Sequence, residues 1–246
     1  MIEIRQLSKT FASHYALQDI SFSASRGERI ALTGRNGAGK TTLLRLLSTY
    51  LPATSGFATV EGLDLFSESN AIRALIGYLP ENAPLYLDMR VAEYLKFRGQ
   101  LRRMSRLHLY RRLHEVISFC DLGQYRNSPI GSLSCGLRHR IGIADAIMHE
   151  PKVLLLDDPL AACDPYQAEK ITDMLSSDEI CGNTTVIFST HSRETVQAIA
   201  TRLICLERGS LCQDTTDLAC LRYNSLQSLF VRWQNGAEKQ TEHSPP

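Results

Sequence analysis

The first candidate for chemistry in this 246-residue chain is a glycine-rich loop. It comprises Gly34, Arg35, Asn36, Gly37, Ala38, Gly39, Lys40, Thr41 and Thr42. Because glycine tolerates positive φ and close backbone approach, the N–H groups of such a loop can surround a polyphosphate. Lys40 can reach the terminal phosphates, and the Thr41 hydroxyl can complete the shell of a Mg²⁺ ion. An apolar run precedes the loop and a leucine-rich helical pattern follows it, as a phosphate-binding loop requires.

A pair of carboxylates, Asp157 and Asp158, ends the apolar run 153–156. Such a run indicates a strand buried on both faces, and open α/β sheets bind ligands at the carboxyl ends of their strands. Asp157 is therefore a candidate to hold Mg²⁺, usually through water, opposite Thr41. Asp158 is a candidate to orient the attacking water. His191 ends another expected strand, so it can share the same rim.

Composition limits the class of protein. With 43% hydrophobic residues, the chain can bury a full core as one domain or a core plus a subdomain. The net charge of +1 argues against binding through a strongly basic overall field. No apolar run reaches the length of about 18 residues that spans a membrane, and the start lacks the apolar block of a secretory signal. Seven scattered cysteines without a CxxC pair favour reduced, packed thiols in a cytosol.

Residue periodicity predicts strands at the start, helices in the middle and strands again afterwards. The expected strands are 2–7, 20–24, 29–33, 57–60, 75–79, 152–156, 184–189, 202–206 and 211–213. The expected helices follow the glycine loop and span 91–101, 107–120, 134–149, 165–175 and about 218–232. The polar tail 236–246 is expected to be disordered.

The helical middle carries many arginines. They include Arg98, Arg102, Arg103, Arg106, Arg111 and Arg112. A solvated helix face is the simpler interpretation. The alternative is a surface for an anionic partner, such as lipid headgroups or an acidic loop.

A second candidate anion-binding segment lies between the glycine loop and His191. The segment Leu133-Ser134-Cys135-Gly136-Leu137 is a short polar turn that opens an arginine-bearing helix. Taken in order, these pieces resemble the nucleotide-binding subunit of ATP-binding cassette (ABC) transporters over nearly the whole chain. The sequence around Glu81 is most similar to that of the branches that serve efflux or ABC-2 type permeases.

The resemblance assigns roles position by position. Residues 34–42 look like the Walker A loop, 153–157 like Walker B, and Asp158 takes the place of the catalytic glutamate. Phe11 is similar in position to the aromatic that stacks on adenine. Glu81 stands where the Q-loop glutamine contacts Mg²⁺ or water. The remaining matches are Ser134 and Gly136 to the signature turn, Asp164 to the D-loop aspartate and His191 to the switch histidine.

The family also implies an architecture. The expected fold class is α/β: a P-loop NTPase core with a mostly parallel sheet, an antiparallel β subdomain and an inserted α-helical subdomain. The core would comprise 1–81 and 150–215, the helical insertion 82–149, and the rest a C-terminal helix and tail, all within one ABC ATPase domain. The implied cofactors are ATP and Mg²⁺.

The implied partners are a second cassette and a membrane protein. Two subunits, identical or different, would pair head to tail, with each ATP between one subunit's P-loop and the other's signature turn. A multi-span permease would dock on the segment from about Glu81 to Gln100. This places the protein at the cytoplasmic face of the cell membrane.

Three departures from the family pattern affect mechanism. Asp158 replaces glutamate and is one methylene shorter, and a misplacement of about 1 Å can cost on the order of 10²-fold in rate. Cys135 replaces the first glycine of the signature pair, and Glu81 replaces glutamine. Because Mg²⁺ and the P-loop carry most of phosphoryl transfer, the sequence predicts slow hydrolysis with nucleotide binding retained.

Several functions compete at this point. The favoured one is a transport ATPase subunit that drives a membrane permease. The alternative is a regulatory nucleotide-binding subunit that hydrolyses little and pairs with a competent cassette. A cassette acting on nucleic acid is disfavoured because such proteins usually carry two cassettes or a long coiled-coil insertion, and this sequence shows neither. No nucleic acid partner is therefore expected. A GTPase is disfavoured because no [NT]KxD motif occurs.

Overall fold

The computed structural model describes residues 1–218 except 162 and 178–181. Two sheets form its framework. One is four-stranded in the order β2-β1-β4-β5, and the other is six-stranded in the order β10-β9-β3-β8-β7-β6. The first sheet contains β1 (Ile2–Phe11), β2 (His14–Ala24), β4 (Ser55–Val60) and β5 (Leu63–Asp64). The second contains β3 (Arg29–Thr33), β6 (Ile76–Leu79), β7 (Val153–Leu156), β8 (Thr185–Ser189), β9 (Arg202–Glu207) and β10 (Ser210–Thr215).

The six-stranded sheet is parallel apart from its edge strand. β3 lies between β8 and β9, and β7 lies between β8 and β6, all in parallel register. Only β10 runs antiparallel, against β9. Strands β7 and β8 are buried along their whole length, as expected for a parallel sheet covered on both faces. Their carboxyl ends therefore reach one common edge.

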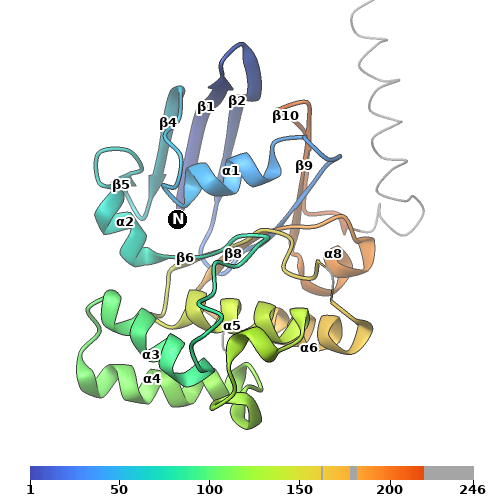
Figure 1. The fold of residues 1–246 in the computed structure, drawn as a ribbon. Coiled ribbons are helices and arrows are strands. Elements are labelled where there is room, and N and C mark those ends of the chain that lie inside the picture. The colour runs from blue at the N-terminus through green and yellow to red at the C-terminus, as the bar shows by residue number, and fades with distance from the viewer. Residues whose placement is uncertain (162, 178–181, 219–246) are drawn as a thin grey trace, which may run out of the picture.

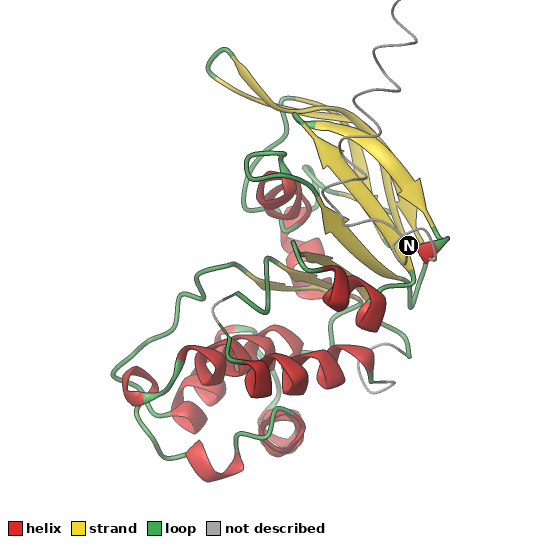
Figure 2. Cartoon of the chain, turned by 90° about the vertical axis from the view of Figure 1, so that its right-hand side faces the viewer, coloured by secondary structure: helices red, strands yellow, loops and turns green. Residues whose placement is uncertain are grey.

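Helix α1 (Lys40–Leu47) lies between the two sheets. Its four leucines, Leu43, Leu44, Leu46 and Leu47, are completely buried. They belong to one core cluster with apolar residues of both sheets, including β1, β3 and β4. The other face of the parallel sheet packs on the helices α3 (Val91–Leu101), α4 (Arg106–Phe119), α5 (Cys135–Ile147) and α6 (Pro165–Ser176). Figures 1 and 2 show the antiparallel sheet and these helices at opposite ends of the molecule.

The arginines of the helical section do not form a uniformly solvated face. Arg98 pairs with Asp145 at 2.9 Å, and Asp145 also accepts a hydrogen bond from the Tyr94 hydroxyl. Arg112 donates to the Ile147 carbonyl at 3.0 Å and pairs with Glu115 at 2.7 Å. The interpretation as a solvated face is therefore wrong for part of the run, because these arginines join α3 and α4 to α5. Arg103, Arg106 and Arg111 are exposed.

Some elements differ from the expected ones. The first two strands extend further and form a long hairpin, because cross-strand pairing continues to the Phe11–His14 pair. Two seven-residue helices, α2 (Ser69–Leu75) and α8 (Arg193–Ile199), were not expected. They are too short to display a clear helical period, and α2 buries only Ile72. The expected helix near 218–232 and the tail fall almost entirely outside the described residues.

Candidate nucleotide site

The glycine loop after β3 has the backbone conformation that glycine permits. Gly37 and Gly39 have φ of 78° and 106°. Gly39 is also the N-cap of α1, and a Cβ there would lie 2.7 Å from the Ala16 carbonyl oxygen. A Cβ on Gly34 would lie 2.3 Å from the Leu206 carbonyl oxygen. The neighbouring strands therefore exclude side chains here, and the loop presents its backbone and the N-terminus of α1 to the outside.

Lys40 is held back against this loop. Its Nζ donates to the carbonyl oxygens of Gly34 at 2.8 Å and Arg35 at 3.1 Å. The residue is only 8% exposed. Burial lowers the pKa of Lys40, and the charges of Asp157 and Asp158 oppose that effect. An ammonium desolvated in this way is ready to exchange carbonyl partners for phosphate oxygens.

Thr41 and Asp157 meet at the start of α1 and the end of β7. The Thr41 hydroxyl donates to Asp157 Oδ1 at 3.1 Å, and the Ser189 hydroxyl donates to the same oxygen at 2.8 Å. The other oxygen, Asp157 Oδ2, is buried without a hydrogen-bond partner among the described residues. A buried carboxylate oxygen without a partner is costly unless a ligand satisfies it. A carboxylate and a hydroxyl side by side are a donor set that suits Mg²⁺.

Asp158 follows directly with φ of 46°. Aspartate is among the few residues that adopt this left-handed region readily. Its N–H donates to the Ser189 hydroxyl at 2.8 Å. Burial raises the pKa of the Asp158 carboxyl; Glu81 and Asp157 raise it further, against the opposing effects of His191 and Lys40. Burial, followed by the charge of Lys40, lowers the pKa of His191, so its imidazole is neutral at neutral pH.

One cavity of about 560 Å³ brings most of the expected site together. It is lined by loop residues Asn36, Gly37, Ala38, Gly39, Lys40, Thr41 and Thr42, by Glu81, and by the rim residues Asp157, Asp158 and His191. Gly34 and Arg35 contribute through the carbonyls that hold Lys40. Phe11 is not among the lining residues and is 46% exposed near the tip of the β1–β2 hairpin. Its contact with adenine stays a prediction.

Three lining residues were not anticipated: His14, Ala16 and Ser189. Ser189 ends β8 at the same edge as Asp157, so the rule about carboxyl ends of strands could have identified it. No sequence signal marks His14 or Ala16. They reach the cavity because the hairpin leans onto the core, where the Gln18 N–H donates to the Gly209 carbonyl at 2.7 Å.

Ser134, Gly136 and Asp164 lie outside this cavity, at the starts of α5 and α6. Ser134 caps α5, and its hydroxyl accepts from the Leu137 N–H at 3.3 Å. Asp164 caps α6 through the Gln167 N–H at 3.0 Å. Gly136 is buried where the two helices meet. Within one chain these residues do not complete the P-loop cavity.

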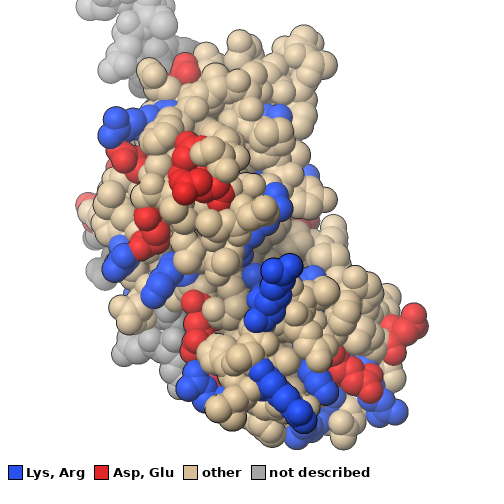
Figure 3. Space-filling view, turned by 90° about the vertical axis from the view of Figure 1, so that its left-hand side faces the viewer, with Lys and Arg blue, Asp and Glu red and all other residues tan. Residues whose placement is uncertain are grey.

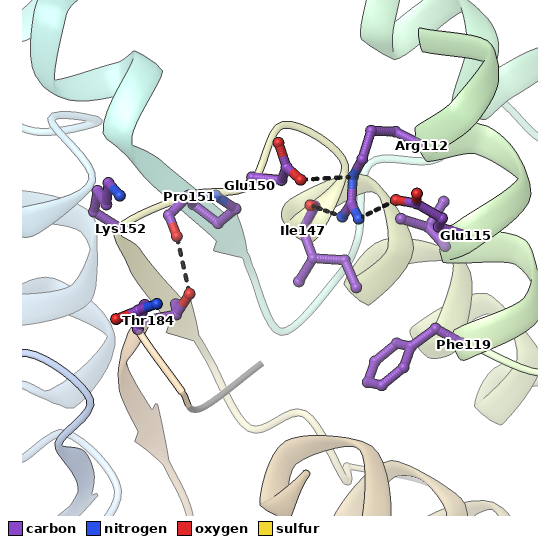
Figure 4. A pocket seen from close by; sticks show the side chains of 10 residues that line it. Arg112, Glu115, Phe119, Ile147, Glu150, Pro151, Lys152 and Thr184 are labelled. Atoms are coloured by element: carbon purple, nitrogen blue, oxygen red, sulfur yellow. Dashed lines mark hydrogen bonds and ion pairs between the residues drawn. The ribbon is translucent and has the colours of Figure 1, made fainter. Parts of the chain in front are cut away.

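A second cavity, of about 290 Å³, lies beside α4 and the end of α5 (Figure 4). Its lining shares no residue with the P-loop cavity. The guanidinium of Arg112 points into it but is already engaged by Glu115, Glu150 and the Ile147 carbonyl. Of these two cavities, the P-loop cavity is the one lined by a buried carboxylate oxygen without a partner, Asp157 Oδ2.

Comparison with known proteins agrees with this geometry. A family model described as ABC transporter matches residues 17–161, which is more than half of the chain. The chain belongs to the ABC transporter family.

Two relatives of this ABC protein come from Bacillus subtilis (strain 168). The uncharacterized ABC transporter ATP-binding protein YxlF is 34% identical over 211 residues, covering 86% of this chain and 69% of the relative. The linearmycin resistance ATP-binding protein LnrL is 29% identical over 211 residues, covering 86% of this chain and 68% of the relative.

Solved structures confirm the fold class of the ABC cassette. An ATP-binding subunit of an ABC transporter superimposes with a TM-score of 0.84 at 24% identity, covering 95% of this chain and 99% of that one. A dimeric cassette in a post-hydrolysis state bound to ADP and phosphate gives a TM-score of 0.79 at 24% identity, covering 87% and 98%. At this identity the likeness concerns the fold alone.

Family membership gives the coarse function. The protein is the ATP-binding subunit of an ABC transporter and an ATPase, and subunits of this kind energise a membrane permease. No helix in the described part of the chain has the length and apolarity needed to cross a membrane.

Proposed function

We propose that this subunit binds Mg-ATP in the P-loop cavity and hydrolyses it slowly, in a dimer whose second cassette completes the site. The observation that supports this most directly is that one chain carries the expected site residues in two separate places. The loop, Asp157, Asp158 and His191 share one cavity, whereas Ser134 and Asp164 lie elsewhere. A second cassette would bring its own Ser134 and Asp164 to the open side of the cavity.

Each side chain of the cavity has a role that follows from its surroundings. Backbone N–H groups of the loop and the start of α1 bind phosphate oxygens. Lys40 leaves its two carbonyl partners for the terminal phosphates. Thr41 and Asp157 would hold Mg²⁺, with Glu81 nearby, and the ion supplies charge neutralisation for the transferred phosphoryl group. The unpaired Asp157 oxygen supports this assignment.

Asp158 is the proposed acceptor of the proton of the attacking water. Because its carboxyl pKa is raised, the carboxylate is a stronger base than a solvent-exposed aspartate. Its side chain is nevertheless short, with one methylene fewer than the glutamate that it replaces. The Asp158 carboxylate is therefore basic enough to accept the proton but too short to reach the attacking water well. The short reach supports slow turnover. Neutral His191 can donate a hydrogen bond toward the transferred phosphate.

We propose that the permease docks beside the segment from Glu81 to Gln100. A groove of about 550 Å³ borders this segment, and its lining includes Tyr50, Tyr78, Leu85 and Arg102. Tyr86 and Leu87, in the same segment, are about half exposed. Figure 3 shows this side of the molecule, with basic side chains around a hollow. An amphipathic helix of a membrane protein would match such a lining, and docking there places the subunit on the cytoplasmic face of the membrane.

The dimerisation of the purified protein tests the proposal. Sedimentation velocity with Mg-ATP should show a dimer that reverts to monomer after the nucleotide is removed. Asp158→Asn should prolong the dimer by blocking hydrolysis, and Ser134→Arg should prevent it while leaving nucleotide binding to the monomer intact. A monomer under all conditions, together with normal ATP binding, would contradict the shared site for a homodimer.

The alternative is a regulatory subunit that hydrolyses little and pairs with a different, competent cassette. Asp158 and Cys135 favour it, since both depart from the family pattern at the site of chemistry. The intact set of Lys40, Thr41 and Asp157 favours the ATPase. Turnover of the isolated protein distinguishes the two: the regulatory subunit would bind Mg-ATP yet release no phosphate above the Lys40→Ala background.

A further inference from the structure

Two thiols converge on one buried histidine where α5 and α6 begin. Cys135 Sγ and Cys163 Sγ each lie 3.7 Å from Nδ1 of His139. His139 is only 6% exposed, whereas both cysteines are half-buried and free. One imidazole nitrogen accepts one proton at a time, so the two thiols share a single proton acceptor.

Close packing of the two helix starts keeps the thiols together. Cys135 is the first residue of α5, and Cys163 directly precedes Asp164, the N-cap of α6. Next to Cys135, a Cβ on Gly136 would lie only 2.6 Å from the Gln167 Cβ in the first turn of α6. Because Gly136 adds no side chain at this contact, α6 approaches α5 closely, and the segments that carry the two sulfur atoms are held side by side.

The surroundings give the two thiols different reactivity. Cys135 is the first residue of α5, so the partial positive charge of the helix start lies next to its sulfur. Burial, and after it the nearby Cys135, raises the pKa of the Cys163 thiol to about 11. Cys135 is therefore the thiol that reacts first, and Cys163 is the one that resolves the product.

We propose that Cys135 and Cys163 form a peroxide-reactive thiol pair that closes to a disulfide, with His139 as the proton acceptor. In the first step His139 takes the Cys135 proton, and the thiolate attacks hydrogen peroxide. A sulfur–oxygen bond forms, the oxygen–oxygen bond breaks, and the leaving hydroxide takes the proton from the imidazolium to give water. Cys135 is then a sulfenic acid.

The second step uses the same base. His139 takes the Cys163 proton, and this thiolate attacks the Cys135 sulfur. The sulfur–sulfur bond forms, the sulfur–oxygen bond breaks, and hydroxide leaves as a second water with the proton returned by the imidazolium. The two thiols have then lost two electrons to one peroxide, which is reduced to two waters. A dithiol reduces the disulfide back to the two thiols by exchange and is itself oxidised to a disulfide.

The disulfide has a consequence that rests on the proposed shared site. It would tie Ser134 and Gly136 to Asp164, the residues proposed to face the second cassette, and fix their relative positions. The P-loop cavity contains none of these residues. Oxidation should therefore leave ATP binding to the monomer unchanged and abolish ATP-dependent dimerisation.

Peptide mapping tests the disulfide without reference to ATP. Trypsin separates the two cysteines into peptides 127–138 and 153–170, each of which contains one cysteine. After peroxide treatment and alkylation of the full chain, mass spectrometry should find these two peptides linked, and separate again after dithiothreitol. Cys120, which is completely buried, should stay reduced and serves as the internal reference. Absence of the linked pair at peroxide levels that oxidise a free thiol would overturn the proposal.

Three variants test the roles. Cys163→Ser should leave Cys135 as a sulfenic acid that dimedone labels, and Cys135→Ser should give no labelling at position 163. His139→Gln should slow formation of the linked peptide by about 10²-fold, the usual contribution of a general base. Unchanged kinetics in a folded His139→Gln protein would overturn the role of His139. The dimedone experiment needs no change at this buried position.

Dimerisation is measured separately. Oxidised wild-type protein should bind ATP but remain monomeric, and Cys163→Ser treated in the same way should still dimerise. Dimerisation of the fully linked protein would overturn the consequence for assembly. If the reduced protein never dimerises while the linked peptide forms, the proposed function fails and the thiol pair stands.

Discussion

Thr41 and Asp157, which are 116 positions apart in the sequence, are joined by a hydrogen bond of 3.1 Å at the floor of the P-loop cavity. The contact exists because β3 and β7 both flank β8 and end at the same edge of the parallel sheet. It leaves one oxygen of Asp157 buried and without a partner. A carboxylate arranged in this way is prepared for a cation, and the predictions about hydrolysis start from it.

Asp157→Asn should weaken Mg²⁺-dependent nucleotide binding and turnover by about 10–100-fold, as expected for a group that holds a metal through water. The amide keeps the shape but removes the charge. Calorimetric titration of ATP with and without Mg²⁺ measures the effect, which should be confined to the Mg²⁺ condition. Asp173→Asn, the same change at an exposed position on α6, is the matched control. Equal losses with and without Mg²⁺ would contradict the metal role.

Asp158→Glu should raise the rate of phosphate release, by up to about 10²-fold, because the longer side chain recovers the reach that aspartate lacks. The backbone at this position has φ of 46°, which glutamate tolerates less well than aspartate, so thermal stability should fall slightly. Steady-state hydrolysis and a melting curve measure both effects. A variant that melts normally but hydrolyses no faster would show that Asp158 does not limit turnover.

Asp158→Asn should stabilise the nucleotide-free protein at neutral pH. The carboxyl pKa is raised in the folded state, chiefly by burial, so the folded protein binds more protons than the unfolded chain around that pKa. The free energy of unfolding of the wild type therefore falls as pH rises through the pKa of the folded state. Below the pKa of the unfolded state, the charged carboxylate no longer destabilises the fold. Scanning calorimetry should find the variant melting a few degrees higher at pH 7, with the gain vanishing near pH 4. A gain independent of pH would point to backbone strain instead of charge.

The sequence was informative wherever the chemistry depends on local spacing. The glycine loop, the strand before it and the acids after β7 are contiguous patterns, and the carboxyl-end rule correctly predicted that Asp157, Asp158 and His191 share one cavity with Lys40. The helix expected at 91–101 has the same bounds in the structure. These features follow from periodicity and from residue preferences that tertiary packing did not override.

Contacts between distant elements were not predictable in the same way. The sequence alone favours a solvated face for Arg98, because its partner Asp145 is 47 residues away on another helix. His14 reaches the cavity only because the antiparallel hairpin lies against the core. In each case the position of the side chain is decided by a contact with a residue far away in the sequence. Patterns among neighbouring residues contain no information about such a contact.

Gly136 combines a feature that the local sequence indicates with a contact that only the structure shows. Its substitution gives the last prediction. The sequence suggests a residue that lets an anion approach, whereas the structure adds that a Cβ would meet Gln167 Cβ and Cγ at 2.6 Å. Gly136→Ala should therefore cost about 1–3 kcal/mol in the free energy of unfolding, the usual range for overpacking. Gly123→Ala, at a glycine with open space around it, is the matched control and should be close to neutral. In a double-mutant cycle with Gln167→Gly, the two changes together should cost less than their sum, because the second removes the clash. Strict additivity in denaturant titrations would show that the α5–α6 contact does not require glycine at this position.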